Sequence, residues 1–217
     1  WSSDVCSSDL VEGEGGKMMP KYADWEQTVK FHGHVCPGVV VGHRACWYAR
    51  QLLDLKTASL APEYVVVAEN DLCGIDAVQI NTGCTLGNDN LIIDNQGKQV
   101  FSFINKKSGQ GVRIILEAPL WPSNHPISLH KKVKLGTASP EETQEFFRLR
   151  QQRGEELLML SDEELFKVEH ITKKIQGKPR LHPVIRCSKC NEQVMQPWTQ
   201  PHDSLMLCPR CFSTEDR

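Results

Sequence analysis

Apolar residues at helical spacing mark the most regular stretch in the first half of the chain. Between Val39 and Leu55 they recur every three or four positions, which predicts a helix that buries one face. Three of them, Gly42, Ala45 and Ala49, are small, so we expect another element, for example the same helix of a second subunit, to approach closely. The stripe consists of Val39, Gly42, Ala45, Cys46, Ala49, Leu52 and Leu53, with Arg44, Arg50 and Gln51 expected on the surface.

A short lead-in helix is predicted before this stripe. Tyr22, Trp25 and Val29 share one helical face, and Phe31 is expected to close the helix against the core. After the stripe, Tyr64–Ala68 is a short β-branched run, which predicts a buried strand.

A second helix is predicted over residues 72–82. Asn70 or Asp71 is a suitable N-cap, and Gly83 suits the left-handed position that ends many helices. Residues 91–94, 99–105 and 112–117 then form three apolar runs joined by polar loops with glycines, which predicts a three-stranded meander. The fold class expected from this order is α+β, with helices packed on a mixed β-sheet.

The segment after this meander is predicted to be helical once an irregular stretch ends. Residues 119–127 contain three prolines and no periodic pattern. Ser139 and Pro140 predict the start of a helix, and the sequence from Ser161 to Glu164 has the form of a capping box for a second one. The side chains expected to point inward from the first helix are Phe146, Phe147 and Leu149.

Composition narrows the class of protein. The chain has 217 residues and a formal net charge of −2, so no global field draws it to nucleic acid or acidic lipid. No apolar run has the length of a membrane span, and the N-terminus lacks the pattern of a signal peptide. The paired spacing of several of its nine cysteines is typical of metal sites in a reducing compartment. We therefore expect a cytoplasmic protein.

The domain organisation is predicted from shifts in composition. Residues 1–10 resemble the conceptual translation of a sequencing-library adapter, so we set residues 1–19 aside as an artefact and a disordered lead. Cys6 then drops out of the count of cysteines. Residues 20–172 are expected to form the α+β core with its helical extension, residues 173–183 a linker, and residues 184–217 a zinc ribbon.

The first candidate site lies in the segment 31–46. His32, His34 and Cys36 alternate, and side chains two apart share a face when the backbone is extended. Pro37 favours an extended Cys36 at the start of the next helix, where the helix dipole stabilises a thiolate. Imidazole and thiolate groups bind zinc and similar first-row metals, and three protein ligands leave a position open. The competing interpretation is a turn with two surface histidines and a buried cysteine.

Two further cysteines flank the second predicted helix. Cys73 is expected in its first turn, with Asp76 nearby, and Cys84 follows Gly83. Cys73 is thus a candidate to complete a His/Cys site, and either cysteine is also explained as a small buried apolar residue.

The C-terminal segment carries the strongest metal motif. Cys187 and Cys190 form one Cys-x-x-Cys unit, and Cys208 and Cys211 form a second. Four thiolates in this arrangement are typical of a structural zinc ribbon, whereas iron–sulfur clusters usually show other spacings. The segment is too small to fold on a core alone, so its folding is expected to depend on the metal.

Three motifs in order, at residues 31–38, 72–79 and 82–87, resemble the FmdE family of formylmethanofuran dehydrogenase proteins. They are Phe-His-Gly-His-Val-Cys-Pro-Gly, Leu-Cys-Gly-Ile-Asp-Ala-Val-Gln and Thr-Gly-Cys-Thr-Leu-Gly, within a match from about Trp25 to Glu117. The resemblance implies a core like the C-terminal domain of glyceraldehyde-3-phosphate dehydrogenase, a metal in a Cys/His pocket and a homodimer. It also implies association with a molybdenum or tungsten formylmethanofuran dehydrogenase in methanogenesis.

Three functional hypotheses follow. The first is a dimeric metalloprotein that binds zinc or another first-row divalent metal at an exchangeable core site, where an enzyme would use the metal to polarise a carbonyl or activate water. The second is a non-catalytic accessory subunit or metal carrier for a molybdenum or tungsten oxidoreductase. The core ligands in both cases are drawn from His32, His34, Cys36, Cys73 and Cys84.

The third hypothesis is nucleic-acid binding by the ribbon, and the charge pattern disfavours it. Arg186, Lys189, Arg210 and Trp198 are its local support. Four acidic residues dilute that basic charge. They are Glu192, Asp203, Glu215 and Asp216.

Overall fold

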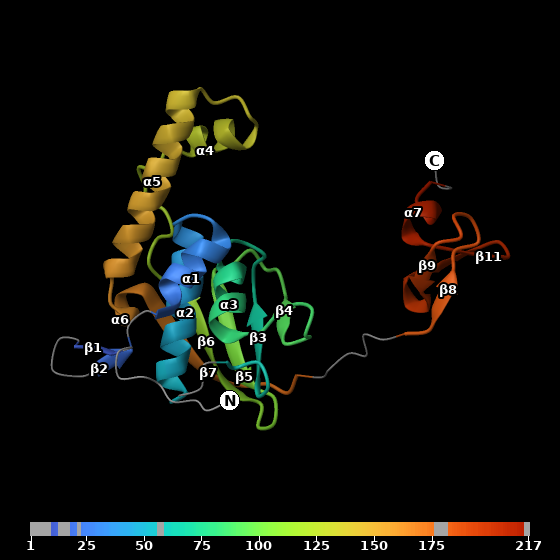
Figure 1. Cartoon of the computed structure of the whole chain (residues 1–217), viewed down its shortest axis with the longest axis horizontal. Helices are drawn as coiled ribbons and strands as arrows, with labels where there is room; N and C mark the ends of the chain where they lie inside the picture. The colour runs from blue at the N-terminus through green and yellow to red at the C-terminus, as the bar shows by residue number, and fades with distance from the viewer. Residues whose placement is uncertain (1–9, 13–17, 21–22, 56–58, 176–181, 215–217) are drawn as a thin grey trace. The chain divides into compact units, whose positions relative to one another are not determined.

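The computed structural model describes residues 10–12, 18–20, 23–55, 59–175 and 182–214. The chain divides into two compact units, residues 1–175 and residues 176–217 (Figure 1). Most of the adapter-like segment, Tyr22, residues 176–181 of the predicted linker, Glu215 and Asp216 lie outside the described residues. Residues 10–12 (β1) and 18–20 (β2) pair as antiparallel strands, so the expectation of disorder was wrong for this part of the lead.

A five-stranded mixed sheet forms the centre of the first unit, and the fold is α+β as predicted. The strand order is β4-β3-β5-β6-β7. Strands β3 and β4 run parallel, and the other neighbours are antiparallel. The strands are β3 (Tyr64–Ala68), β4 (Leu91–Ile93), β5 (Val100–Asn105), β6 (Gln110–Leu116) and β7 (Phe166–Thr172).

The predicted meander is only half correct. β5 and β6 form the expected hairpin, but β4 does not pair with β5. A helix connects β3 to β4, and such a crossover returns the chain parallel to its first strand, so β4 lies at the sheet edge beside β3. β7 completes the opposite edge and was not predicted, because its residues are mostly polar and only partly buried.

Helices α1 (Ala23–His32), α2 (Pro37–Leu52) and α3 (Gly74–Thr82) cover one face of this sheet (Figure 1). The strands alternate in the expected way, so that every second side chain points toward the helices. The core between the layers includes Val66, Phe101, Phe103, Val112 and Ile114 from the strands and Val40, Val41, Ala45 and Val78 from the helices.

The small residues of α2 serve contacts within the chain. A methyl group at Gly42 would overlap the carbonyl oxygen of Gly74 in α3, and one at Gly74 would lie 2.8 Å from the Phe101 ring. The close neighbour of this face is therefore α3 of the same subunit. The homodimer stays a prediction, now without the support of this stripe.

A helical hairpin separates β6 from β7. It consists of α4 (Ile127–Lys134), which lies at the end of the stretch expected to be irregular, and the long α5 (Pro140–Met159), which extends away from the sheet (Figure 1). The capping boxes of α5 at Ser139 and of α6 (Asp162–Leu165) at Ser161 form as predicted. Phe146 is buried as expected, whereas Phe147 is 49% exposed.

Arg44 anchors the end of this hairpin instead of lying on the surface as predicted. Its guanidinium is 4% exposed and donates to the carbonyl oxygens of Leu158 and Leu160 at 2.9 and 2.8 Å. It also pairs with the Asp162 carboxylate at 2.7 Å. A buried charge that binds the last carbonyls of α5 fixes the helix against α2.

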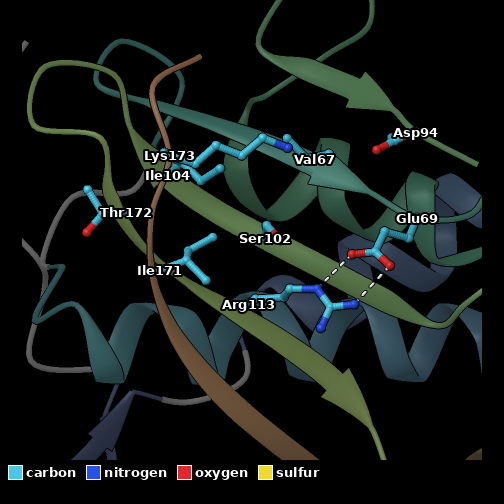
Figure 2. A pocket seen from close by; sticks show the side chains of 9 residues that line it. All are labelled: Val67, Glu69, Asp94, Ser102, Ile104, Arg113, Ile171, Thr172 and Lys173. Atoms are coloured by element: carbon cyan, nitrogen blue, oxygen red, sulfur yellow. Dashed lines mark hydrogen bonds and ion pairs between the residues drawn. The ribbon is translucent and has the colours of Figure 1, made fainter.

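The other face of the sheet carries a cavity of about 370 Å³ beside an ionic cluster. Figure 2 shows Arg113 bonded to both oxygens of Glu69, at 2.7 and 2.9 Å. A second carboxylate, Glu169, pairs with the same guanidinium at 2.9 Å, and the two acids raise the pKa of Arg113. The charge of Arg113 is thus matched inside the chain, which is typical of a structural ion network.

The second unit consists of two small hairpins and a short helix. β8 (Val184–Arg186) pairs with β9 (Gln193–Met195), and β10 (Gln200–His202) pairs with β11 (Leu205–Leu207). A 3-10 turn, η2 (Gln196–Trp198), precedes β10, and helix α7 (Pro209–Phe212) follows Cys208.

Candidate functional site

His32, His34 and Cys36 come together because the chain turns sharply between two helices. His32 is the last residue of α1, Gly33 has a φ of +89°, and Cys36 is the extended N-cap of α2. The extended stretch that we predicted is therefore confined to the residues before Pro37. A side chain at Gly33 would be strained in this left-handed conformation, so the turn depends on glycine.

One donor atom from each of His32, His34 and Cys36 lies within 4.8 Å of the others. The His32 Nδ1 is 2.7 Å from Asp76 Oδ2, and its Nε2 is 3.6 Å from the Cys36 sulfur. A carboxylate at Nδ1 holds the proton there and leaves the Nε2 lone pair facing the thiol. This arrangement is the one that metal-binding histidines use.

Cys73 meets Cys36 where two helices begin. Cys73 is the N-cap of α3, one position earlier than predicted, and Gly38 in α2 permits its close approach. A hydrogen bond between the two thiols lowers the pKa of Cys36 and raises that of Cys73, because the Cys73 proton stabilises a Cys36 thiolate. The pair thus holds one thiolate in the absence of any metal.

Arg150 of α5 reaches the same cluster from the helical hairpin. Its Nη2 lies 3.0 Å from His34 Nε2, and since arginine can only donate, this nitrogen of His34 accepts. Burial lowers the pKa of His34, which keeps the ring neutral. A neutral imidazole is the form that binds metals.

Cys84 lies at the opposite end of α3 from Cys73. It is fully buried in the main core, and its sulfur is 3.8 Å from the Tyr64 carbonyl oxygen. The structure does not bring it to the group formed by His32, His34 and Cys36. This position matches the alternative of a small buried residue.

The four cysteines of the second unit form a compact group of their own. One sulfur from each of Cys187, Cys190, Cys208 and Cys211 lies within 4.8 Å of the others. The Cys208 amide donates to the Cys187 sulfur at 3.3 Å, and backbone N–H groups of Cys190 and Cys208 lower the pKa of Cys187. A set of four thiols with amide donors fits a tetrahedral zinc-ribbon site.

Two residues of the core site had no assigned role in the sequence analysis. Asp76 was noted only as a neighbour of Cys73, and its contact with His32 spans 44 positions in the sequence. Arg150 was not noticed, although it lies one helical turn after Phe146 and therefore shares its face. That spacing is the signal that could have indicated an inward guanidinium.

The donor sets of both groups suit metal ions. The core offers two imidazoles and two thiols, one of them held as a thiolate, and the second unit offers four thiols. Among the described residues, no helix is long and apolar enough to cross a membrane.

Comparisons with known proteins agree with this geometry. A family model described as "FmdE, Molybdenum formylmethanofuran dehydrogenase operon" matches residues 31–167. A curated relative, "Probable S-adenosyl-L-methionine-binding protein" of Archaeoglobus fulgidus, is 32% identical over 189 residues, which is 84% of this chain. The chain spans only 50% of that relative's length.

A solved structure has the same fold. It is the crystal structure of an FmdE-like protein of tungsten formylmethanofuran dehydrogenase from Syntrophus aciditrophicus. The two share a TM-score of 0.55 and 22% identity, over 90% of this chain and 94% of the other.

Proposed function

The chain belongs to the FmdE family, and on that premise we propose that its core is a metal-binding centre held by His32, His34, Cys36 and Cys73. The metal is zinc or another first-row divalent ion, which the mixed imidazole and thiolate set favours. The four cysteines of the second unit hold a separate, structural zinc. This assignment keeps Cys84 out of the ligand set, because it lies in the main core.

The observation that carries the proposal is the orientation of His32. Its ring is fixed at both ends, by Asp76 at 2.7 Å on Nδ1 and by the Cys36 sulfur at 3.6 Å from Nε2. A surface histidine beside a buried cysteine needs no carboxylate behind it, whereas a metal ligand gains basicity and a fixed tautomer from one.

The chemistry of the site follows from its donors. A divalent metal held there would supply Lewis acidity toward a carbonyl group or lower the pKa of a bound water. The chain itself contributes the ordered imidazole of His32, a thiolate at Cys36, and a guanidinium at Arg150 that faces His34. An exchangeable site of this kind serves a metalloenzyme or a metal carrier for a molybdenum or tungsten oxidoreductase.

Metal analysis of the full chain tests the proposal. Cys36→Ser should lose about one metal ion per chain and keep the ribbon metal, because the two sites share no ligand. Cys84→Ala is the matched control and should keep both, since it removes a buried thiol outside the group. If Cys36→Ser and His34→Ala both retained the full metal content, the cluster would be a packing feature.

The curated relative supports a second candidate, S-adenosyl-L-methionine binding. The 32% identity extends over 84% of this chain, so the conserved part includes the core. Equilibrium dialysis of the full chain with labelled S-adenosyl-L-methionine tests this candidate, and retention at or below the level of a protein blank would reject it.

The setting we propose is the cytoplasm. All eight described cysteines are free thiols, and both clusters need thiolates as ligands. A reducing compartment preserves such groups, whereas an oxidising one would pair them as disulfides.

A further inference from the structure

Arg150 differs from other arginines of the first unit in its charge partners. Four of those arginines pair with acidic side chains of the same chain. Arg150 has no carboxylate partner among the residues that the structure describes. The four pairs are Arg44 with Asp162, Arg113 with Glu69, Arg148 with Glu145, and Arg153 with Glu156.

The guanidinium of Arg150 is nevertheless held in place. One nitrogen donates to His34 at 3.0 Å, and the group lies over the Phe146 ring, 5.2 Å from its centroid. Stacking on an aromatic face and one directed hydrogen bond orient the planar group while leaving other N–H donors unused. A cation fixed in this way beside candidate metal ligands needs a physical explanation.

The charge of the metal-loaded site makes that need sharper. A divalent ion with the Cys36 thiolate and two neutral imidazoles carries a net positive charge, and a second thiolate at Cys73 would only bring it to neutrality. In either state the positive charge of Arg150 is not compensated by the site. Partly buried charges are stabilised by partners of opposite sign, so an anion is the missing component.

We propose that Arg150 is the recognition residue for a small carboxylate that binds at the core metal site. The inference rests on the proposed function and names the substrate class of the same site. A carboxylate suits it because the planar guanidinium offers parallel N–H donors that match two carboxylate oxygens. A single guanidinium is less suited to a phosphate group, which in proteins usually gathers several donors.

A simpler role for Arg150 would be to stabilise the Cys36 thiolate through its charge. The two roles differ in what the loss of the guanidinium changes. A thiolate-stabilising arginine affects metal affinity, whereas a recognition residue leaves metal content intact and affects anion binding.

The full chain loaded with Co²⁺ separates these roles, because the visible spectrum of Co²⁺ reports changes among its ligands. Formate and acetate are titrated at constant ionic strength, and the spectrum of Cys36→Ser, which keeps only the ribbon site, is subtracted. Three arginine variants are compared with the unaltered chain. Arg150→Gln removes the charge, Arg150→Lys keeps it without the planar fork, and Arg148→Gln removes an exposed, ion-paired arginine of the same helix.

The unaltered chain and Arg148→Gln should show the same saturable spectral change. Arg150→Gln should keep its core metal and bind the anions about ten- to a hundredfold more weakly, the loss expected for a charge-assisted hydrogen bond. Arg150→Lys should fall between them, because it retains the charge alone.

Three results would overturn the inference while the core metal remains established. They are equal anion affinity in Arg150→Gln, no anion response in the unaltered chain, and loss of the core metal from Arg150→Gln, which would assign the arginine to thiolate stabilisation. An unaltered chain with no core metal would instead overturn the proposed function and the inference with it.

Discussion

At the scale of single residues, Asp76 governs which nitrogen of His32 is available to a ligand. Its carboxylate is 2.7 Å from Nδ1, and the side chain is 40% exposed, so it is one of few acids beside the thiol cluster. An imidazole that donates from Nδ1 has its lone pair on Nε2, which faces Cys36. Asp76 therefore acts through His32 and positions it for binding.

Asp76→Ala should weaken core metal binding about ten- to a hundredfold, the usual effect of losing an acceptor behind a histidine ligand. Competition with a chromophoric chelator measures this affinity. Asp71→Ala removes a nearby exposed acid and should change nothing. An affinity for the core metal that is unchanged in Asp76→Ala would mean that packing alone orients His32.

The residues of the site differ in how far the sequence alone can locate them. His32, His34 and Cys36 form a local motif, so their proximity was predictable even though the turn at Gly33 was not. The partners Asp76 and Arg150 join the site through tertiary contacts across 44 and 116 positions. Spacing carries no information about such contacts, because they depend on how α3 and α5 pack.

At the scale of elements, the approach of α2 to α3 decides the geometry around Cys36 and Cys73. Gly42 and Gly74 face each other with no space for a methyl group. Elements with strong local patterns, such as α2, β3 and α3, lie within a few residues of their predicted bounds. β4 and β7 do not follow from local pattern, because a crossover and a long insertion select their partners.

Gly42→Ala should destabilise the fold by about 1–3 kcal/mol, since overpacking forces the two helices apart. This loss outweighs the gain of about 0.5–1 kcal/mol that alanine brings to a helix interior. Urea unfolding followed by circular dichroism measures the difference.

Gly87→Ala is the matched control for this substitution. An added methyl at Gly87 meets no atom within 4 Å, and the free energy of unfolding should change by less than about 0.5 kcal/mol. A Gly42→Ala variant as stable as the unaltered chain would show that α2 and α3 separate without cost.

At the scale of the whole molecule, the two units are stabilised by different means. The first has an extensive apolar core between helices and sheet. The buried residues of the second are Leu207 and three cysteines, with Val194 and Phe212 packed against them. A core composed mostly of thiols excludes little water, so the free energy of folding must come largely from a bound metal.

Removal of metal should therefore unfold the second unit and spare the first. Hydrogen exchange in the presence of a strong chelator should show lost protection over residues 182–214 and retained protection in β3, β5 and β6. A Cys187→Ser, Cys190→Ser double variant should lose the same protection without chelator. Persistent protection of residues 182–214 in either experiment would contradict a structural metal.

The late position of β7 in the chain has a consequence for the order of folding. β6 ends at Leu116 and β7 begins at Phe166, so their pairing waits for the whole α4–α6 insertion, and pairings between distant segments form slowly. His32, His34, Cys36 and Cys73 are brought together by α1, α2 and α3 over a much shorter span. Arg150 lies within the insertion. A nascent chain thus assembles its metal ligands first and gains the guanidinium only when the last strand closes the sheet.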